Sequence, residues 1–210
     1  MFITLEGIEG CGKSTQAERL YRALKSRAIP VIFTREPGGT RIGEEIRKIL
    51  LATSNRELSP AAEFLLMEAD RAQHVAEVIK PALKKGMWVV CDRFFDATVA
   101  YQGYGRGVDL ALVERLNHFS SQGIVPDKTF LLDCPVEIGL SRAMERNRIW
   151  KKEGEGRFED EDVAFHQKVR QGYLELAKSA PGRFVVLDAT RGEEELEEQI
   201  FQHIAPLVKR

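Results

Sequence analysis

Residues 7–14 read Gly7-Ile8-Glu9-Gly10-Cys11-Gly12-Lys13-Ser14 and match the pattern G-x-x-x-x-G-K-[S/T] at every fixed position. An apolar run precedes this stretch, and a segment of helical spacing follows it. Glycines let the backbone curl so that successive N–H groups point into one concavity, and the helix N-terminus adds partial positive charge. The stretch therefore predicts a phosphate-binding loop, in which Lys13 reaches the β- and γ-phosphates and the Ser14 hydroxyl ligates Mg²⁺.

Strand-length apolar runs recur along the chain and alternate with longer segments that have apolar residues at three- and four-residue spacing. The runs cover 2–5, 31–34, 87–91, 129–132 and 184–187, and the helical segments cover 14–27, 60–85, 110–121, 135–146 and 158–177. Nearly continuous apolar strands are typical of parallel sheets covered on both faces. We therefore expect an α/β fold of the P-loop NTPase type, with a doubly wound, five-stranded parallel sheet flanked by helices.

Composition narrows the class of protein further. The chain has 210 residues, a length typical of one domain, which we place at 1–210. Its 31 basic and 32 acidic residues give a net charge of −1, which offers no overall electrostatic basis for binding nucleic acid or an anionic membrane. No signal peptide and no run of 18 apolar residues occurs, and the three cysteines have no C-x-x-C spacing. We expect a cytoplasmic protein.

A phosphate loop alone leaves three classes open: a switch GTPase, a motor ATPase or a small-molecule kinase. The N-K-x-D motif that reads guanine does not occur in this sequence, and large ATPases usually need a longer chain. The pair Asp92-Arg93 directly follows the run at 87–91 and favours the kinase interpretation. At the carboxyl end of a parallel strand, Asp92 could hold Mg²⁺ and Arg93 could clamp a phosphate. A surface ion pair at a strand end is the alternative.

The segment 142–157 is unusually basic. Three glutamates accompany six basic residues, which are Arg142, Arg146, Arg148, Lys151, Lys152 and Arg157. Gly154 and Gly156 suggest partial mobility. The segment could be an arginine-rich lid over a phosphate site or an ordinary solvated loop.

Several separate blocks make the chain resemble the thymidylate kinase family of P-loop nucleoside monophosphate kinases, in its bacterial type. These blocks are GIEGCGKST at 7–15, TREPGGT at 34–40, ADRAQH at 69–74, CDRFFDATVAYQGYGRG at 91–107, PDKTFLLD at 126–133 and RFEDEDVAFHQKVRQGYLELA at 157–177. The resemblance covers nearly the whole chain. It implies transfer of the γ-phosphoryl group of ATP to dTMP, giving dTDP and ADP for dTTP synthesis, with Mg²⁺ and commonly as a homodimer.

The resemblance also implies roles for the phosphate-binding residues. ATP would contact the loop from Gly7 to Thr15 together with Arg142, and the metal would lie at Ser14 and Asp92. Glu9 matches the acidic loop residue that contacts the acceptor sugar. The bacterial type lacks an arginine in this loop and carries its catalytic arginine in the lid. The choice among Arg146, Arg148 and Arg157 stays open, because the aspartate that often precedes the Arg-Phe-Glu block is Gly156 here. The catalytic set it implies is Lys13, Glu9, Asp92, Arg93, Arg157 and Arg148.

For the acceptor nucleotide, the resemblance implies the following contacts. Arg71 matches the arginine that donates to thymine O4, Thr98 and Gln102 match the polar pair along the base edge, and Tyr101 matches the tyrosine that crowds the 2′ position. The arginines matching those around the acceptor phosphate are Arg35, Arg47 and Arg93. The family usually stacks a phenylalanine on thymine, and the register places Met67 there; Phe64, three residues earlier, is the alternative.

Two other functions compete with this interpretation. Another nucleoside monophosphate or deoxynucleoside kinase of the same fold would share the phosphate chemistry, but TREPGGT and ADRAQH argue against it. A nucleotide-dependent regulatory switch would show slow turnover that no acceptor stimulates. Separately, the position of Cys11 in the phosphate loop, ahead of a helix N-terminus and beside Lys13, suggests a reactive thiol that ATP–Mg²⁺ protects. A small residue tolerated in a tight loop is the alternative.

The expected role of Arg47 gives a first prediction. If Arg47 holds the acceptor phosphate, Arg47→Ala should raise the Michaelis constant for dTMP more than that for ATP, because only the acceptor loses a charge-assisted contact. Steady-state kinetics with each substrate varied in turn measures both constants. An equal effect on the two would contradict the assignment.

Overall fold

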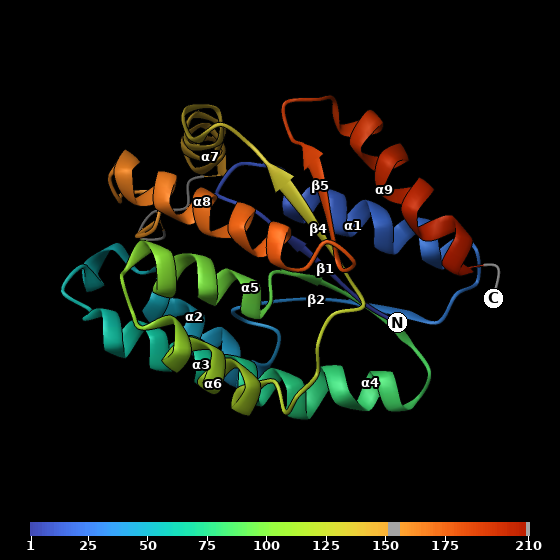
Figure 1. The fold of residues 1–210 in the computed structure, drawn as a ribbon, viewed down its shortest axis with the longest axis horizontal. Coiled ribbons are helices and arrows are strands. Elements are labelled where there is room, and N and C mark those ends of the chain that lie inside the picture. Colours follow the sequence, from blue (N-terminus) through green and yellow to red (C-terminus); the bar gives the residue numbers. More distant parts are fainter. Residues whose placement is uncertain (151–155, 209–210) are drawn as a thin grey trace.

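Five parallel strands form the centre of the molecule in the order β2-β3-β1-β4-β5. The computed structural model describes residues 1–150 and 156–208 (Figure 1). The strands are β1 (Phe2–Glu6), β2 (Val31–Arg35), β3 (Trp88–Asp92), β4 (Lys128–Asp133) and β5 (Phe184–Asp188). Every pair of neighbouring strands is parallel. The expected α/β fold with a five-stranded parallel sheet is therefore confirmed.

Helices and helical turns connect and flank the strands. In chain order they are α1 (Lys13–Lys25), α2 (Arg41–Leu51), η1 (Thr53–Asn55), α3 (Pro60–His74), η2 (Val75–Ile79), α4 (Lys80–Lys84), α5 (Phe95–Thr98), η3 (Val99–Gly105), α6 (Leu110–Ser120), α7 (Val136–Trp150), α8 (Val163–Ser179) and α9 (Glu193–Val208). Helices α1 and α9 pack on each other and on the sheet, and α8 contacts β4, β5 and η3.

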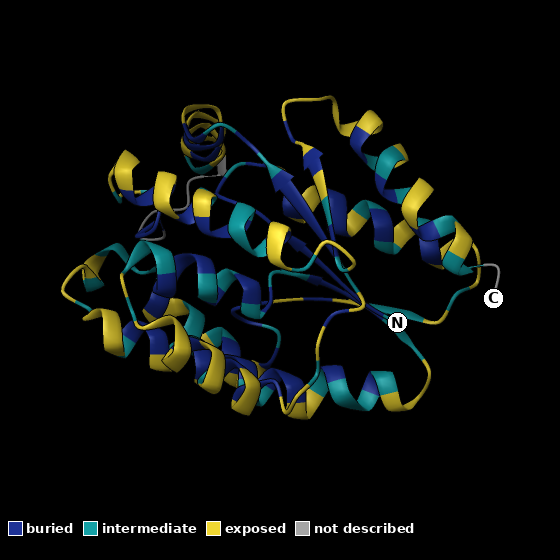
Figure 2. Ribbon diagram, in the orientation of Figure 1, coloured by how far each residue is buried: buried dark blue, intermediate teal, exposed yellow. Residues whose placement is uncertain are grey.

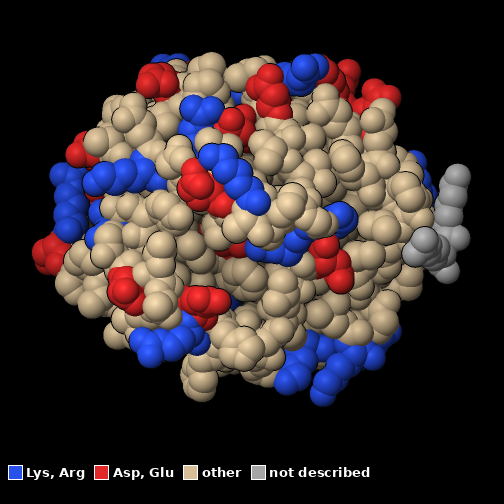
Figure 3. All heavy atoms as spheres, viewed as in Figure 1, with Lys and Arg blue, Asp and Glu red and all other residues tan. Residues whose placement is uncertain are grey.

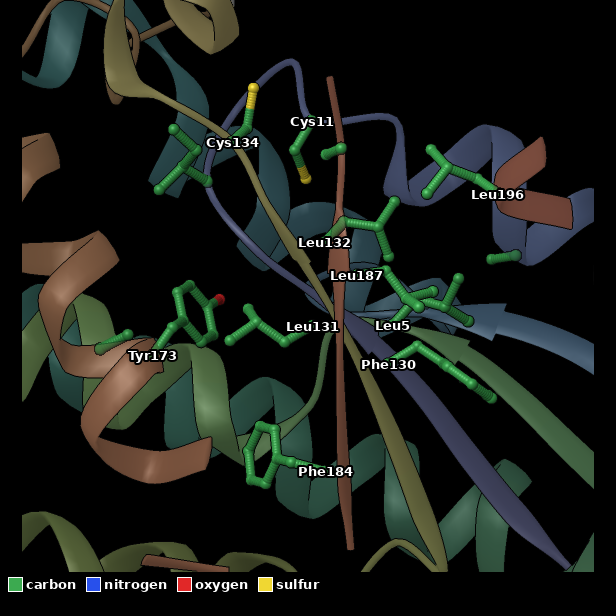
Figure 4. Packing of buried hydrophobic residues seen from close by; sticks show 14 of the residues in the cluster. Leu5, Cys11, Phe130, Leu131, Leu132, Cys134, Tyr173, Phe184, Leu187 and Leu196 are labelled. Carbon is green, nitrogen blue, oxygen red and sulfur yellow. The ribbon is translucent and has the colours of Figure 1, made fainter. Parts of the chain in front are cut away.

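The core lies between the sheet and these helices. In Figure 2 the central strands and the inward helix faces are mainly dark blue, whereas the outer helix faces are yellow, and the outer strands β2 and β5 are partly exposed. Leu5, Phe130 and Leu132 from the central strands meet Tyr173 of α8 and Leu196 of α9 in one hydrophobic cluster (Figure 4). Because both faces of the sheet are covered, the strands are nearly continuous in apolar residues, as parallel strands are.

The surface carries mixed charge. Basic and acidic side chains are interspersed over the face drawn in Figure 3. Among the described residues, no helix has the length and apolar character needed to cross a membrane.

Several elements differ from the sequence-based expectation. The expected helix at 60–85 divides into α3, η2 and α4, and η2 is a π-helical turn. Helix α2 and the α5–η3 segment were not expected, because their apolar residues are interrupted by glycines and polar residues. Each strand ends one residue later in the structure than expected. The last residue of four of the five strands is acidic: Glu6, Asp92, Asp133 and Asp188. Their carboxylates lie at the carboxyl ends of the strands, where ligands bind in open parallel sheets.

The phosphate loop packs unusually closely on the start of α7. Gly10 has a left-handed φ of +67°, and a Cβ there would lie 1.9 Å from the carbonyl oxygen of Gly139. Conversely, a Cβ on Gly139 would lie 2.6 Å from the Glu9 carbonyl oxygen. Two glycines thus allow backbone to meet backbone, and neither position has room for a side chain.

This contact predicts a large stability difference between two glycine substitutions. Gly10→Ala should lower the free energy of unfolding by about 1–2 kcal/mol for the left-handed backbone and by a further ~1–3 kcal/mol for the clash with Gly139. Gly86→Ala is the matched control, since Gly86 has a φ of +72° and a Cβ there would meet no atom within 4 Å. Urea unfolding of both variants measures the difference. Equal destabilisation of the two variants would show that α7 can move away from the new methyl group with no loss of stability.

Candidate active site

A cavity of about 690 Å³ opens at the carboxyl ends of the central strands. It joins the phosphate loop to the inner faces of α3, α5 and η3. Fourteen of the residues expected to act in the site line it: Glu9, Gly10, Lys13, Ser14, Thr15, Arg35, Arg47, Met67, Arg71, Asp92, Arg93, Thr98, Tyr101 and Gln102. Segments that lie far apart in sequence thus form one continuous wall.

At the phosphate-loop end, Lys13 is held inside the loop. Its ammonium donates to the Ile8 carbonyl oxygen at 2.5 Å and lies 3.5 Å from the Cys11 sulfur. Gly12, with a φ of +92°, precedes the first turn of α1, and Ser14 and Thr15 follow in that turn. The positive end of α1 and a lysine therefore face the same space, which is an arrangement that binds phosphate.

Ser14 and Asp92 meet at the mouth of this loop. The Ser14 hydroxyl donates to Asp92 Oδ2, and Asp92 Oδ1 is buried with no hydrogen-bond partner among the described residues. A hydroxyl beside a carboxylate with a spare buried oxygen fits Mg²⁺, which commonly takes one or two protein oxygens and fills its other positions with water and phosphate. No group of three or more His, Cys, Asp or Glu side chains in the described part of the chain could hold a metal alone. The donor set therefore suits a metal that arrives with a nucleotide.

Arg93 lies at the middle of the cavity wall in a strained backbone conformation. Its φ is +72°, in the left-handed region that non-glycine residues rarely adopt. Its guanidinium donates to the Gly7 carbonyl oxygen at 2.9 Å, to Glu9 Oε1 at 3.0 Å and to the Tyr101 hydroxyl at 3.2 Å. The strain is thus offset by a network that fixes the direction of the guanidinium.

Glu9 is the acidic member of that network. Tyr101 donates to Glu9 Oε1 at 2.5 Å, and His166 Nδ1 lies 3.3 Å from Glu9 Oε2. Burial alone would raise the pKa of Glu9, but His166, Arg93, Lys13 and Tyr101 together hold that pKa well below its usual range. Glu9 is therefore a carboxylate at neutral pH and can only accept hydrogen bonds from a ligand.

At the far end of the cavity, Arg71 is almost fully held by the protein. Its Nε donates to Glu36, its Nη1 donates to Glu68 and Asn117, and its Nη2 donates to Thr98, at 2.8–3.0 Å. These contacts use four of the five N–H groups of a guanidinium. The fifth, on Nη2, has no partner among the described residues and is the one donor that Arg71 can offer to a ligand.

The structure separates the two candidates for a stacking platform. Met67 lines the cavity, whereas Phe64 is buried in the protein away from it. On α3, Met67 and Arg71 are one helical turn apart and therefore share a face. A thioether is a soft, polarisable surface for an aromatic ring.

Three of the four lid arginines do not line the cavity. Arg148 is exposed and pairs with Glu145 at 2.7 Å. Arg157 is buried and donates to the Leu50 carbonyl oxygen and to Glu63, both at 2.7 Å. Arg142 donates to the Ala189 carbonyl oxygen at 2.9 Å. Arg146, which was one of three alternatives, lines the cavity, and residues 151–155 of the expected lid lie outside the described residues.

The hypothesis of a reactive Cys11 thiol does not fit the structure. Cys11 is 1% exposed, and its side chain lies among core residues between Cys134 and Leu132 (Figure 4). A reagent cannot reach the sulfur while the loop keeps this shape. The alternative, a small residue in a tight loop, agrees with the packing.

Sequence reasoning missed several residues of the wall. Glu36 and Asp70 line the cavity, and Asp70 Oδ1 accepts from the Gly38 backbone N–H at 3.0 Å. Burial and the charge of Glu36 raise the pKa of Asp70 to about 6. Asp70 lies inside the ADRAQH block, but no spacing rule in the sequence distinguishes a wall residue from a helix surface residue.

The parallel sheet, the phosphate loop and the arginines that line the cavity together define a P-loop phosphotransferase. The family model described as thymidylate kinase matches residues 5–200. A thymidylate kinase from Trichlorobacter lovleyi is 56% identical over 190 residues, covering 90% of both chains, and one from Solidesulfovibrio magneticus is 50% identical over 209 residues, covering 99% of this chain and all of that one. The crystal structure of thymidylate kinase from Ehrlichia chaffeensis aligns with a TM-score of 0.73 at 36% identity, covering 89% of this chain and 91% of that one.

The chain belongs to the thymidylate kinase family. The resemblance found in the sequence and the expectation of an ATP-dependent dTMP kinase are thereby confirmed.

A buried carboxyl beneath the site makes stability depend on pH. Glu6, at the end of β1, accepts from the Phe94 backbone N–H at 2.7 Å and from the Tyr173 hydroxyl at 2.9 Å. Burial and the nearby Asp96 raise the pKa of Glu6 from 4.5 to about 8, against the opposing effect of Arg93. Between these two values the folded protein retains a proton that the unfolded chain releases.

Stability should therefore fall as pH rises from about 5 to 8, and Glu6→Gln should remove this part of the dependence. The slope attributable to one proton is at most about 1.4 kcal/mol per pH unit. Urea unfolding of both proteins across this range gives the difference in free energy of unfolding, which should move in favour of the variant as pH rises. Parallel curves would contradict the raised pKa.

Proposed function

We propose that the cavity binds the two substrates of the family reaction at opposite ends, ATP at the phosphate loop and dTMP between α3, η3 and Arg93. The reaction is transfer of the γ-phosphoryl group of ATP to dTMP, giving dTDP and ADP. The main support for this arrangement is that one cavity connects the phosphate loop with the buried guanidinium of Arg71, which has one N–H donor left for a ligand.

At the donor end, the loop amides and Lys13 would hold the phosphates of ATP, with Gly7 to Thr15 and Arg142 as the contacting set. Ser14 and Asp92 would hold Mg²⁺, which neutralises phosphate charge when it is bound. Lys13 would exchange its bond to the Ile8 carbonyl oxygen for one to a phosphate oxygen. That exchange replaces a neutral acceptor with an anionic one and is favourable.

At the acceptor end, Arg35, Arg47 and Arg93 would surround the phosphate of dTMP. The Arg35 side chain pairs with Glu44 at 2.7 Å and is half exposed, so it can reorient at small energetic cost. Glu9 would accept a hydrogen bond from the sugar hydroxyl, and Tyr101 would occupy the space that a 2′-hydroxyl needs. Because Glu9 also orients Arg93, sugar and phosphate recognition share one network.

The base would lie on Met67, with its edge against Arg71, Thr98 and Gln102. The spare N–H of Arg71 would donate to thymine O4. Cytosine presents an amino donor at this position, and two facing donors leave both without acceptors.

The chemical step needs charge stabilisation more than a base. A phosphate monoester is mostly dianionic at neutral pH, since its second pKa is about 6, so the nucleophile is already formed. Lys13 and Arg93 would offset the charge that spreads over the transferred group. A lid arginine would add to this, with Arg148 and Arg157 as first expected and Arg146 as the one that lines the cavity. Closure over the nucleotides would exclude water and suppress ATP hydrolysis.

We also propose a homodimer and a single kinase domain at 1–210. Helices α3 and α6 pack together and leave Leu65, Leu112 and Phe119 exposed, an apolar face that a second copy could cover. The single sheet supports one domain. We propose a cytoplasmic location, which suits three free cysteines.

An acceptor panel tests this function. ADP release with ATP–Mg²⁺ should be strongly stimulated by dTMP, weakly by dUMP, which lacks only the methyl contact, and little by dCMP, dGMP, AMP or thymidine. Thymidine stimulation would overturn the acceptor-phosphate site, and stimulation by another monophosphate would overturn the base contacts. A rate that no acceptor raises would leave a nucleotide-dependent switch as the function.

A further inference from the structure

One buried carboxylate outside the cavity wall contacts three side chains from two other segments of the chain. The side chain of Glu63, in the first turn of α3, is 0% exposed. Its Oε1 accepts from Gln102 Nε2 at 2.8 Å and from Arg106 Nε at 3.1 Å. Its Oε2 accepts from Arg106 Nη2 at 3.0 Å and from Arg157 Nη2 at 2.7 Å.

The charges around Glu63 balance. Arg106 also pairs with Glu161 at 2.6 Å, so two carboxylates face two guanidinium groups. Burial raises the pKa of Glu63, but hydrogen bonds from Arg106 and Gln102 outweigh this and lower it overall. Glu63 is thus ionised at neutral pH, and an ionised carboxylate has no proton to donate.

This ionisation fixes the direction of the Gln102 amide. Only the NH₂ group of Gln102 can face a carboxylate that only accepts, so the amide nitrogen is committed to Glu63. Gln102 lines the cavity and Glu63 does not. The carbonyl Oε1 is therefore the amide atom that Gln102 can present to a ligand.

A carbonyl at this position distinguishes two kinds of pyrimidine. Thymine carries a hydrogen on N3, which a carbonyl accepts, whereas N3 of cytosine is itself an acceptor and opposes a carbonyl. The spare donor of Arg71 and the carbonyl of Gln102 then match O4 and N3–H of thymine, and the Thr98 hydroxyl beside them can donate or accept. A free amide could rotate and present NH₂ to cytosine, and this would relax the discrimination.

We propose that Glu63 is a specificity-determining positioning residue, which holds the Gln102 amide so that its carbonyl accepts from the imide N3–H of the acceptor base. The inference rests on the proposed placement of dTMP. Glu63 does not touch the substrate and acts through Gln102 alone.

Glu63→Gln tests the proposal with little change in side-chain volume. Oε2 of Glu63 accepts from two arginine N–H groups, on Arg106 Nη2 and Arg157, whereas Oε1 accepts from one, on Arg106 Nε. The new carbonyl should therefore take the Oε2 position, and the new NH₂ would then face Gln102 and invert its amide. The ratio of kcat/KM for dTMP to that for dCMP should fall at least tenfold, while the KM for ATP stays within twofold. The ratio comes from one enzyme preparation, so partial unfolding cancels from it.

Two further variants separate specificity from stability. Glu161→Gln removes a partner of Arg106 that does not contact Gln102, and it should keep the wild-type ratio. The exchange E63Q/Q102E retains the charge of the cluster and places a carboxylate oxygen at the base, so it should restore most of the discrimination. If the single variant does not fold, the exchange alone decides.

A folded Glu63→Gln enzyme with the wild-type ratio, or a folded exchange variant that does not discriminate, overturns the proposal. These outcomes differ from failure of the proposed function. If dTMP does not stimulate the wild-type enzyme, the proposed function itself is wrong. If dTMP does stimulate it but Glu63→Gln leaves the dTMP-to-dCMP ratio unchanged, only the role of Glu63 is wrong.

Discussion

The parallel pairing of β1 with β3 sets the geometry on which the site depends. Leu5 lies opposite Asp92, so both strands end at the same level of the sheet. The phosphate loop leaves β1 at this level, and the Arg93 N–H donates to the Leu5 carbonyl oxygen at 3.1 Å. A shift of one residue would turn each side chain to the opposite face of the sheet and separate Ser14 from Asp92. The hydrophobic residues that hold the register therefore also position the charged ones.

Buried charge is the second constraint. Glu36, Glu63 and Glu68 lie inside the protein, where an unpaired carboxylate would be strongly unfavourable. Each accepts from an arginine, and each arginine is in turn held by several acceptors. Such pairs add little net stability, since desolvation offsets the attraction. What they do fix is the direction of each donor and acceptor, because a rotated group would lose its partner inside the protein.

The features that could be predicted from the sequence are those that depend on residues adjacent in the chain. The phosphate loop, the strand runs and Asp92-Arg93 are local patterns, and the structure has the corresponding elements. The contacts of Glu63 were not predictable, because they join residues 39, 43 and 94 positions apart. The burial of Arg157 depends in the same way on Leu50 in α2, a helix that periodicity did not indicate. The α5–η3 segment was missed because glycines and polar residues interrupt its apolar pattern, whereas the π-helical turn η2 lay inside an expected helix.

The glycine contact between the phosphate loop and α7 limits how the enzyme can move. Because the Gly10 and Gly139 backbones touch, the first turn of α7 cannot tilt toward the loop without displacing it. A bend in α7 that keeps this contact intact must therefore lie after Gly139. The backbone of the phosphate loop keeps its shape when α7 bends there, so the later turns of this helix can change direction without rebuilding the loop.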